Sequence, residues 1–301
     1  MTTMKLYTKE ALSITEQIAL LKKRGLRIAD EHKATKFLGE VSYFRFIQYL
    51  RPMEDDKTTH KFKLNSCFED AVALYDFDTE LKVLLFGAIQ RIEVALRSKV
   101  IHEFSIVHGP FWFFDTALAH DEYKFIENMN AISRELQRSR EVFIEEHKRN
   151  YDKPSFPPAW KTLELASFGT LSKLYYNFND KKSKKRIAHQ FNLPNHEVLE
   201  SWMRSLTVLR NFCAHHSRLW NRRLSNAPQM NVALKGSWIS IAGLDHNKIY
   251  AIICCIAYWL DSMGYGQPFK ITLKQLITAY PQVDIVAMGF PKDWLQQALW
   301  V

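Results

Sequence analysis

Apolar residues recur three and four positions apart along most of this chain, which is the spacing of an amphipathic helix. The longest such patterns run from Leu81 to Val100 and from Asn195 toward Arg223. Shorter patterns predict helices over residues 13–24, 29–50, 121–150, 160–178, 249–263, 272–280 and 291–300. No segment keeps the period of two that strands require, and only ten glycines and ten prolines interrupt the 301 residues. The pattern therefore predicts an all-α protein.

Polar residues mark where several of these helices begin. Ser13 and Ser66 are each followed three residues later by a glutamate, in the S-x-x-E pattern of a capping box. Asn195 follows a proline and is a suitable N-cap for the second long helix. We therefore expect that helix over about residues 195–217, and a polar loop over 51–63.

The composition of the chain indicates which kind of partner and which compartment to expect. The chain has 41 Lys and Arg against 32 Asp and Glu, a net charge of +9, which favours nucleic acid over membrane as a partner. A basic protein without a polyanionic partner is the alternative. The longest apolar run, Ile249–Leu260, is too short to span a bilayer and predicts a buried helix. Four cysteines without C-x-x-C spacing indicate neither a zinc site nor a disulfide framework, and no secretory signal is visible, so we expect a cytoplasmic protein.

The segment from Arg210 to Arg223, RNFCAHHSRLWNRR, has the densest polar chemistry on a strongly apolar helical pattern. On a wheel of roughly 100° per residue, one polar arc opposes an apolar face. The residues on the arc are Arg210, Asn211, His215, Arg218, Asn221 and Arg222. His216 falls on the apolar side, near Phe212 and Leu209, so it is expected to be buried. Only His215 is then placed to act with Arg210.

These residue types suit RNA cleavage. A histidine titrates near neutral pH and can move the proton of a ribose 2′-OH, while an arginine stays charged and fits a phosphate. Asn211 could orient the phosphate or the histidine. The R-x4-H spacing alone is weak, because Arg27/His32, Arg97/His102 and Arg140/His147 also match; only Arg210 is followed by Asn. No carboxylate pair, HExxH, P-loop or G-x-S-x-G is present, so neither a metal nor another cofactor is predicted.

Two further groups of charged residues could assist. Glu93 and Arg97 form an i,i+4 pair, which is either a surface ion pair or a pair that faces the polar arc. The densest basic run lies just upstream of the second long helix and consists of Lys181, Lys182, Lys184, Lys185 and Arg186. Such a run is either a solvated face or a set of phosphate contacts.

The chain resembles the Abi-like abortive-infection proteins, the AbiD/AbiF group of the HEPN superfamily. The similar segments, in order, are SYFRFIQYLRP, IEVALRSKV, WKTLELASFGTLSKLY, LRNFCAHHSRLWNR and MGFPKDW, which together span about residues 15 to 300. The resemblance implies a HEPN-type helical bundle with additional N- and C-terminal helices. On that basis residues 1–301 form one domain, with an N-terminal extension over 1–65, a HEPN core over 66–223 and C-terminal helices over 224–301.

The resemblance also implies an activity and partners. It implies a metal-independent endoribonuclease that leaves a 2′,3′-cyclic phosphate, acting as a phage-defence effector or as the toxin of a toxin–antitoxin pair. Its partners would be RNA and an antitoxin or a regulatory RNA. The family motif falls on Arg210, Asn211 and His215, and a single motif implies a homodimer whose two copies face each other. Were Arg97/His102 a second motif, a monomer would suffice, but Ser98 stands after Arg97 in place of the usual residue.

Two other interpretations remain open from the sequence. The same helix could belong to a non-catalytic HEPN protein that binds RNA or serves as a scaffold, with Arg210 used for phosphate contact or dimer packing. In the third interpretation, Arg210 and His215 are satisfied core groups of a structural helical protein. The intact RN-x3-H motif favours the ribonuclease.

Overall fold

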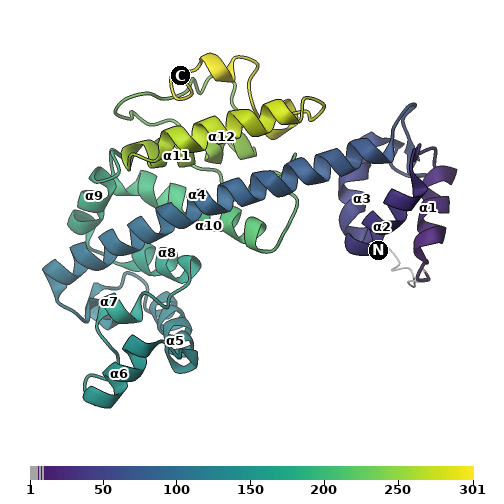
Figure 1. Cartoon of the computed structure of the whole chain (residues 1–301). Coiled ribbons are helices and arrows are strands. Elements are labelled where there is room, and N and C mark those ends of the chain that lie inside the picture. Colours follow the sequence, from purple (N-terminus) through teal and green to yellow (C-terminus); the bar gives the residue numbers. More distant parts are fainter. Residues whose placement is uncertain (1–5, 7, 9) are drawn as a thin grey trace. The chain divides into compact units, whose positions relative to one another are not determined.

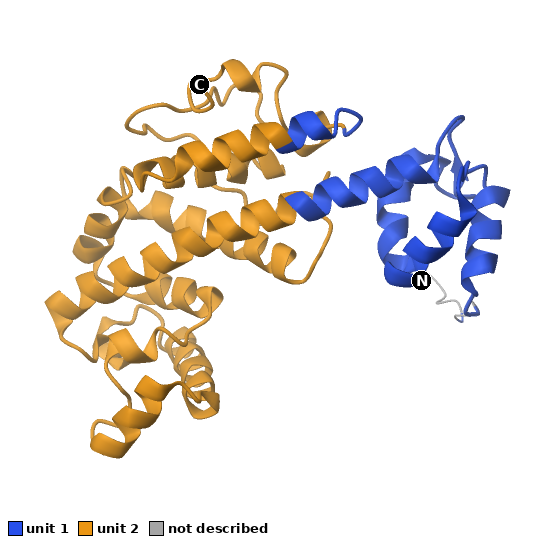
Figure 2. Cartoon of the chain, viewed as in Figure 1, with its two compact units in different colours: residues 1–80, 276–283 blue, residues 81–275, 284–301 orange. Residues whose placement is uncertain are grey.

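The computed structural model describes residues 6, 8 and 10–301 and divides the chain into two compact units (Figure 2). The first unit comprises residues 1–80 and 276–283, and the second comprises 81–275 and 284–301. The longest helix, α4 (Phe68–His108), supplies its first turns to the first unit and the remainder to the second (Figure 1). The boundary between the two units therefore lies inside a continuous helix.

The first unit is a small helical cluster around aromatic side chains. Its elements before α4 are α1 (Ile14–Lys23), α2 (Glu31–Glu40), α3 (Tyr43–Leu50), the 3-10 turn η1 (Arg51–Met53) and the hairpin β1 (Glu54–Asp56) with β2 (Lys61–Phe62). Phe37, Phe46 and Phe68 meet edge-on or tilted, with ring centroids 4.8–5.8 Å apart. The Tyr49 hydroxyl donates to the buried carboxylate of Asp78 at 2.7 Å. The aromatics of α3 thus serve mainly as core.

The observed helix ends in this unit can be compared with those predicted from the capping residues. The capping box at Ser13 forms as predicted, and Gly25 follows the helix with φ of 92°. The one predicted at Ser66 is wrong, because α4 begins at Phe68 and the Glu69 carboxylate instead accepts from the Ala29 N–H at 3.0 Å. The helix expected over residues 29–50 is broken at Ser42, which caps α3.

The second unit is built on α4 and eight later helices. They are α5 (Glu122–Arg138), α6 (Val142–Asn150), α7 (Ala159–Thr162), α8 (Phe168–Asn177), α9 (Lys181–His189), α10 (His196–Ala214), α11 (Ile249–Ser262) and α12 (Gly266–Ala279), the last of which ends in the first unit. The 3-10 turns η2 (Trp112–Phe114), η3 (Thr116–Leu118), η4 (Val286–Met288) and η5 (Trp294–Gln296) lie in the connections and near the C-terminus. The all-α prediction is confirmed, with one two-stranded sheet among the described residues.

Several predicted helices of this unit differ from the structure. The helix expected over 160–178 forms as α7 and α8, and α12 begins six residues before the expected start at residue 272. The one expected over 121–150 is divided into α5 and α6, with Ser139 and Glu141 extended between them. The helix expected over 291–300 is wrong, since only η5 forms there. Trp294, Leu299 and Trp300 are all buried, so this segment is held by packing of large side chains without a helical face.

The core lies where α10 meets α8, α9 and α11. All twelve residues from Ile249 to Leu260 are buried, as the apolar run predicted. Trp202 of α10 packs edge-on against Trp259 of α11 at 5.8 Å. Burial of this face turns the polar residues of α10 outward. In the part of the chain that the structure describes, no helix is long and apolar enough to cross a membrane.

Candidate active site

The end of α10 has a well-defined stop. Asn195 caps the start of the helix through a bond to the Val198 N–H, as predicted. The helix ends at Ala214, three residues before the expected end. His215 is the C-cap, and His216 follows with φ of 54°, in the left-handed region. The N–H groups of His216 and Ser217 bond to carbonyls of the last turn, at 3.1 and 2.9 Å, in the pattern of a Schellman motif.

This early stop corrects the predicted position of His216. The wheel placed its ring among apolar residues of α10, but the wheel does not apply beyond Ala214. His216 is exposed, as is His215. The left-handed position normally selects glycine, since any other residue there costs roughly 1–2 kcal/mol. A histidine is therefore retained at a site where glycine would be more stable.

The residues that follow the end of α10 do not lie on the polar arc that the helical wheel predicted for them. Asn221 has φ of 52° and accepts from the Lys248 ammonium at 2.6 Å. The Arg222 guanidinium lies 4.2 Å from the centroid of the Phe212 ring, so it returns to the last turn of α10. Arg218 is partly buried in this same connection. Asn221 is thus a structural residue, whereas Arg222 stays close to the motif.

Arg210 is held without an acidic partner. Its guanidinium carbon lies 5.8 Å from the centroid of the Phe86 ring on α4, and the residue is half-buried. Its Nε is buried and has no hydrogen-bond acceptor within the described chain. Asn211, next to it, is exposed. Arg210 and His215 are five residues apart, or roughly 7.5 Å along a helix axis. A phosphate could therefore lie against Arg210 within reach of His215.

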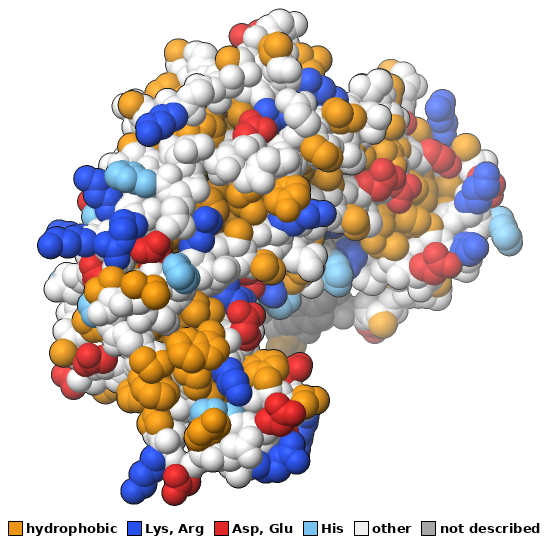
Figure 3. All heavy atoms as spheres, turned by 60° about the vertical axis from the view of Figure 1, so that its left-hand side comes forward, with side chains coloured by type: hydrophobic (Ala, Val, Ile, Leu, Met, Phe, Trp, Pro, Cys, Tyr) orange, Lys and Arg blue, Asp and Glu red, His pale blue; other side chains and the backbone are white. Residues whose placement is uncertain are grey.

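The surroundings of α10 are electropositive. Residues 1–80 contain 13 Lys and Arg and 13 Asp and Glu, so the whole net charge belongs to residues 81–301. From Ser201 to Leu244 there are six Lys and Arg and no Asp or Glu. Arg223 is paired with Asp245 at 2.6 Å. Figure 3 shows Lys and Arg side chains projecting from one face of the molecule between hydrophobic and acidic ones. A polyanion would be attracted to this region.

Glu93 and Arg97 have a different surrounding from the predicted one. Arg97 is buried, and its guanidinium donates to the carbonyls of Leu163 and Ala166, the second at 2.7 Å. It also bonds to Glu93 at 2.8 Å. These carbonyls belong to residues that follow α7, beyond the end of its regular helical hydrogen bonding. Of the two interpretations left open by the sequence, the surface ion pair is excluded because Arg97 is buried, and Arg97 fixes the chain that leads into α8.

The basic run forms α9, and its members have different environments. Lys184 is buried, pairs with Glu200 at 2.9 Å and donates to the Tyr176 carbonyl at 3.0 Å. Burial lowers the pKa of its ammonium, and Glu200 opposes this shift. The prediction that Lys184 contacts RNA is therefore wrong. The sequence suggested exposure because the run is uniformly basic, but one side of α9 packs on α10.

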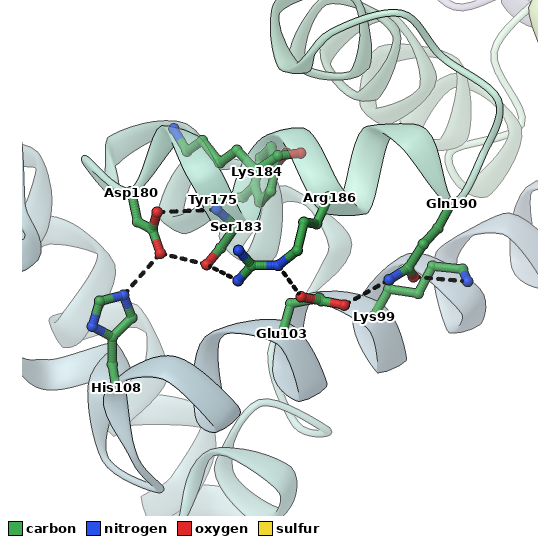
Figure 4. Close-up of polar contacts among 9 residues, drawn as sticks. All are labelled: Lys99, Glu103, His108, Tyr175, Asp180, Ser183, Lys184, Arg186 and Gln190. Carbon is green, nitrogen blue, oxygen red and sulfur yellow. Dashed lines mark hydrogen bonds and ion pairs between the residues drawn. The ribbon is translucent and has the colours of Figure 1, made fainter.

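The rest of α9 is tied to α4 by a polar network (Figure 4). Arg186 donates to the Glu103 carboxylate at 2.7 Å and to the Ser183 hydroxyl at 2.8 Å. Asp180 caps the helix through the Ser183 N–H and bonds to His108 at 2.9 Å. Burial would raise the pKa of Asp180, but the bonds from Ser183 and His108 lower it to about 2. Arg186 is thus partly engaged.

Three lysines of the basic run are exposed and remain available to bind a phosphate, namely Lys181, Lys182 and Lys185.

Two residues near the motif were missed from the sequence. Phe86, which holds Arg210, belongs to the apolar pattern of α4 and gave no signal of its own. Arg204 is exposed, and its guanidinium lies 4.1 Å from the ring centroid of Tyr176 on α8. Because Arg204 is seven residues, or two turns, before Asn211, it falls on the polar side of α10. A wheel begun earlier in the helix would have found it.

A comparison with protein families identifies the family to which the chain belongs. A family model described as Abi-like protein matches residues 36–221, more than half of the chain. The match contains all of α10 together with His215 and His216. No curated protein and no solved structure matches the chain. Because these proteins are named for abortive infection, the match suggests a role in defence against phage. The chain belongs to the Abi-like protein family.

Proposed function

We propose that this protein is a metal-independent endoribonuclease of the HEPN type that acts as an effector of abortive infection. The observation that carries the proposal is the state of Arg210, which is half-buried on Phe86 without an acidic partner in the described structure. It lies in the last turns of a helix that ends at the exposed His215. An arginine kept unpaired in this way is suited to a transferable anion such as a phosphodiester. In the cell, an antitoxin or a partner RNA would restrain the activity.

The residues allow a direct reaction. The His215 imidazole takes the proton of the ribose 2′-OH, and the 2′-oxygen attacks the adjacent phosphorus. Arg210 neutralises the charge that grows on the non-bridging oxygens, and Asn211 is placed to orient the phosphate. The bond to the 5′-oxygen breaks, and that oxygen takes a proton from an imidazolium. The products are a 2′,3′-cyclic phosphate and a 5′-hydroxyl, and no metal ion is needed.

The two proton transfers favour a homodimer. One histidine is required as base and one as acid in the same turnover. Arg97/His102 cannot serve as a second motif, because Arg97 is buried against the carbonyls after α7. A second copy that faces the first would supply the other His215. The exposure of His215, Asn211 and His216 leaves this end of α10 open to such a partner.

One observation favours the non-catalytic alternative. The ring of a catalytic base is usually oriented by a third group, and the ring of His215 has no hydrogen-bond partner among the described residues. In an RNA-binding or scaffold protein, Arg210 and the exposed lysines of α9 would contact phosphates without cleavage.

The test compares purified wild-type protein with His215→Ala and Arg210→Ala on total RNA in EDTA, followed by end-group analysis. Arg149→Ala, at an exposed arginine of α6, is the matched control. We expect wild type and control to produce cyclic-phosphate ends, and both site variants to produce none. RNA binding without cleavage by wild type, control and His215→Ala, with weaker binding by Arg210→Ala, would establish the alternative. Activity that is lost in EDTA and restored by Mg²⁺ would refute the mechanism.

A further inference from the structure

A second cation on α10 is kept free of acidic groups. The Arg204 guanidinium rests on the ring of Tyr176, which is itself 43% exposed. Over the ranges that the structure describes, Arg204 has neither a hydrogen bond nor a carboxylate partner. A guanidinium on an aromatic face keeps its edge, with its N–H donors, available to a ligand. Arg204 thus repeats the state of Arg210.

The lack of a carboxylate at Arg204 has a structural cause. Glu200 lies one turn before Arg204, in the position from which a glutamate normally pairs with an arginine on the same helix. Its carboxylate instead binds the buried Lys184 of α9 at 2.9 Å. Lys184 also holds the Tyr176 carbonyl. The buried Lys184 therefore engages the Glu200 carboxylate, which would otherwise be free to pair with Arg204. It also fixes Tyr176, whose ring contacts the Arg204 guanidinium.

Arg204 lies on an exposed seam between two helices. Helices α8 and α10 pack against each other (Figure 1). A Cβ at Gly169 would lie 3.7 Å from the Thr207 methyl group, whereas Tyr176, later in α8, contacts Arg204, earlier in α10. The helices are therefore antiparallel here. Lys173, one turn before Tyr176, is exposed.

The seam connects the motif to the basic run. Going back along α10 from Asn211, it passes Thr207 and reaches Arg204, roughly 9 Å along the axis from Arg210. Only three residues separate the end of α8 from Lys181, at the start of α9. Within the described part of the chain, cations without carboxylate partners thus occur at Arg210, at Arg204 and at Lys173.

We propose that the seam between α8 and α10 binds the RNA strand leading away from the scissile phosphate, with Arg204 and Lys173 each contacting a phosphate. This inference rests on the proposed function, because it takes the scissile phosphate to be at Arg210. Tyr176 is a positioning residue that holds the Arg204 guanidinium. The strand continues toward Lys181 and Lys182. The ligand is single-stranded, since the contacts follow one backbone along one seam.

The first test measures binding of a short single-stranded 2′-O-methyl RNA, whose blocked 2′-oxygen prevents cleavage, at several salt concentrations. Arg204→Gln should weaken binding about tenfold, the effect of one charge-assisted contact. It should also reduce the salt slope by about 0.7, the value for one phosphate on a single strand. Arg149→Gln, the charge-matched control, should leave both unchanged. Wild-type affinity and slope in Arg204→Gln overturn the proposal.

Tyr176 is tested with two substitutions. Tyr176→Phe keeps the ring and should keep the affinity, while Tyr176→Ala should weaken binding as Arg204→Gln does. Equal affinity of the alanine variant and wild type would overturn the positioning role. A shift of the monomer–dimer equilibrium by Arg204→Gln, with RNA binding unchanged, would assign the seam to a protein interface and also overturn the proposal.

Substrate length separates this inference from the proposed function. A dinucleotide reaches Arg210 but not the seam, so Arg204→Gln should leave kcat/KM for a dinucleotide unchanged and lower it for a longer RNA. If no RNA is cleaved but binding of the 2′-O-methyl strand still depends on Arg204, the proposed cleavage fails and the seam stands. If cleavage occurs and the length effect is absent, the seam fails.

Discussion

Arg97 and Arg210 belong to the same unit, but their surroundings are opposite. Arg97 is buried and bonded to Glu93 and to the carbonyls after α7. Arg210 touches an aromatic ring and, among the described residues, no acid. Both terminal nitrogens of the Arg97 guanidinium donate to groups of the fold, so its charge contributes to stability. The comparison separates an arginine whose guanidinium is bonded within the fold from one whose guanidinium remains available to a ligand, although both occur in R-x4-H spacing.

The largest effect should come from the end of α10. Arg210→Ala and His215→Ala should each lower the rate of RNA cleavage by roughly a thousandfold or more, the size typical of losing a charge stabiliser or a general base. The free energy of unfolding should change by less than about 1 kcal/mol, because His215 is exposed and Arg210 has no acidic partner among the described residues that its loss would leave unpaired. Cleavage assays and melting curves measure the two quantities. A folded His215→Ala protein with wild-type activity would contradict the assignment.

Arg97 should behave in the reverse way. Arg97→Ala should lower the free energy of unfolding by roughly 2–4 kcal/mol, because buried carbonyls and the Glu93 carboxylate lose their donor. Urea unfolding measures the loss. The activity of the protein that remains folded should be close to wild type. If Arg97→Ala instead unfolds like wild type and loses cleavage, Arg97 acts in the reaction and the comparison fails.

Asp180, like Arg97, is a charged residue bonded within the fold, and its contribution to stability should depend on pH. Because its folded pKa of about 2 lies below the usual 3.8, its ionised form stabilises the fold above about pH 4, and this contribution is lost as pH falls toward 2. Asp180→Asn keeps a helix-capping side chain but removes the charge. We expect the variant to be about 2 kcal/mol less stable at neutral pH, with the difference vanishing near pH 2. Unfolding curves across this range would show it; a constant difference would exclude the charge as its cause.

The smallest effect should come from His216. His216→Gly should raise the free energy of unfolding by about 1 kcal/mol, since glycine accepts the left-handed backbone at lower cost. His216→Ala keeps the strain and should not be stabilised. Calorimetry on the pair measures the difference. If the glycine variant is more stable but cleaves more slowly, His216 takes part in the reaction as well.

Local signals in the sequence located most helices and the motif. The capping residues Ser13 and Asn195 and the apolar run at Ile249 were each sufficient because their effects depend on near neighbours. The polar arc applies to Arg210 and Asn211, which both lie within α10. It failed after Ala214, because nothing in the residue types marks a histidine as the left-handed stop that glycine usually provides.

Effects of distant partners could not be predicted from the sequence. Lys184 lies in a run of similar residues, and only the packing of α9 on α10 shows that it is buried with Glu200. Arg97 could be read as a surface residue because its acceptors, near Ala166, are about seventy positions away in the chain. The same packing leaves Arg204 on Tyr176. Thus charged residues were recognised from the sequence, but their availability was decided by tertiary contacts.

The burial of α11 affects how the chain could be shortened. The family match ends at residue 221, whereas the fully buried stretch of α11 begins at Ile249 and packs against α10. A chain cut at the end of the match would keep every residue of the motif but would expose the apolar side of α10. Such a fragment would be prone to aggregate. The limits of family similarity and the limits of an independently folding piece therefore differ in this protein.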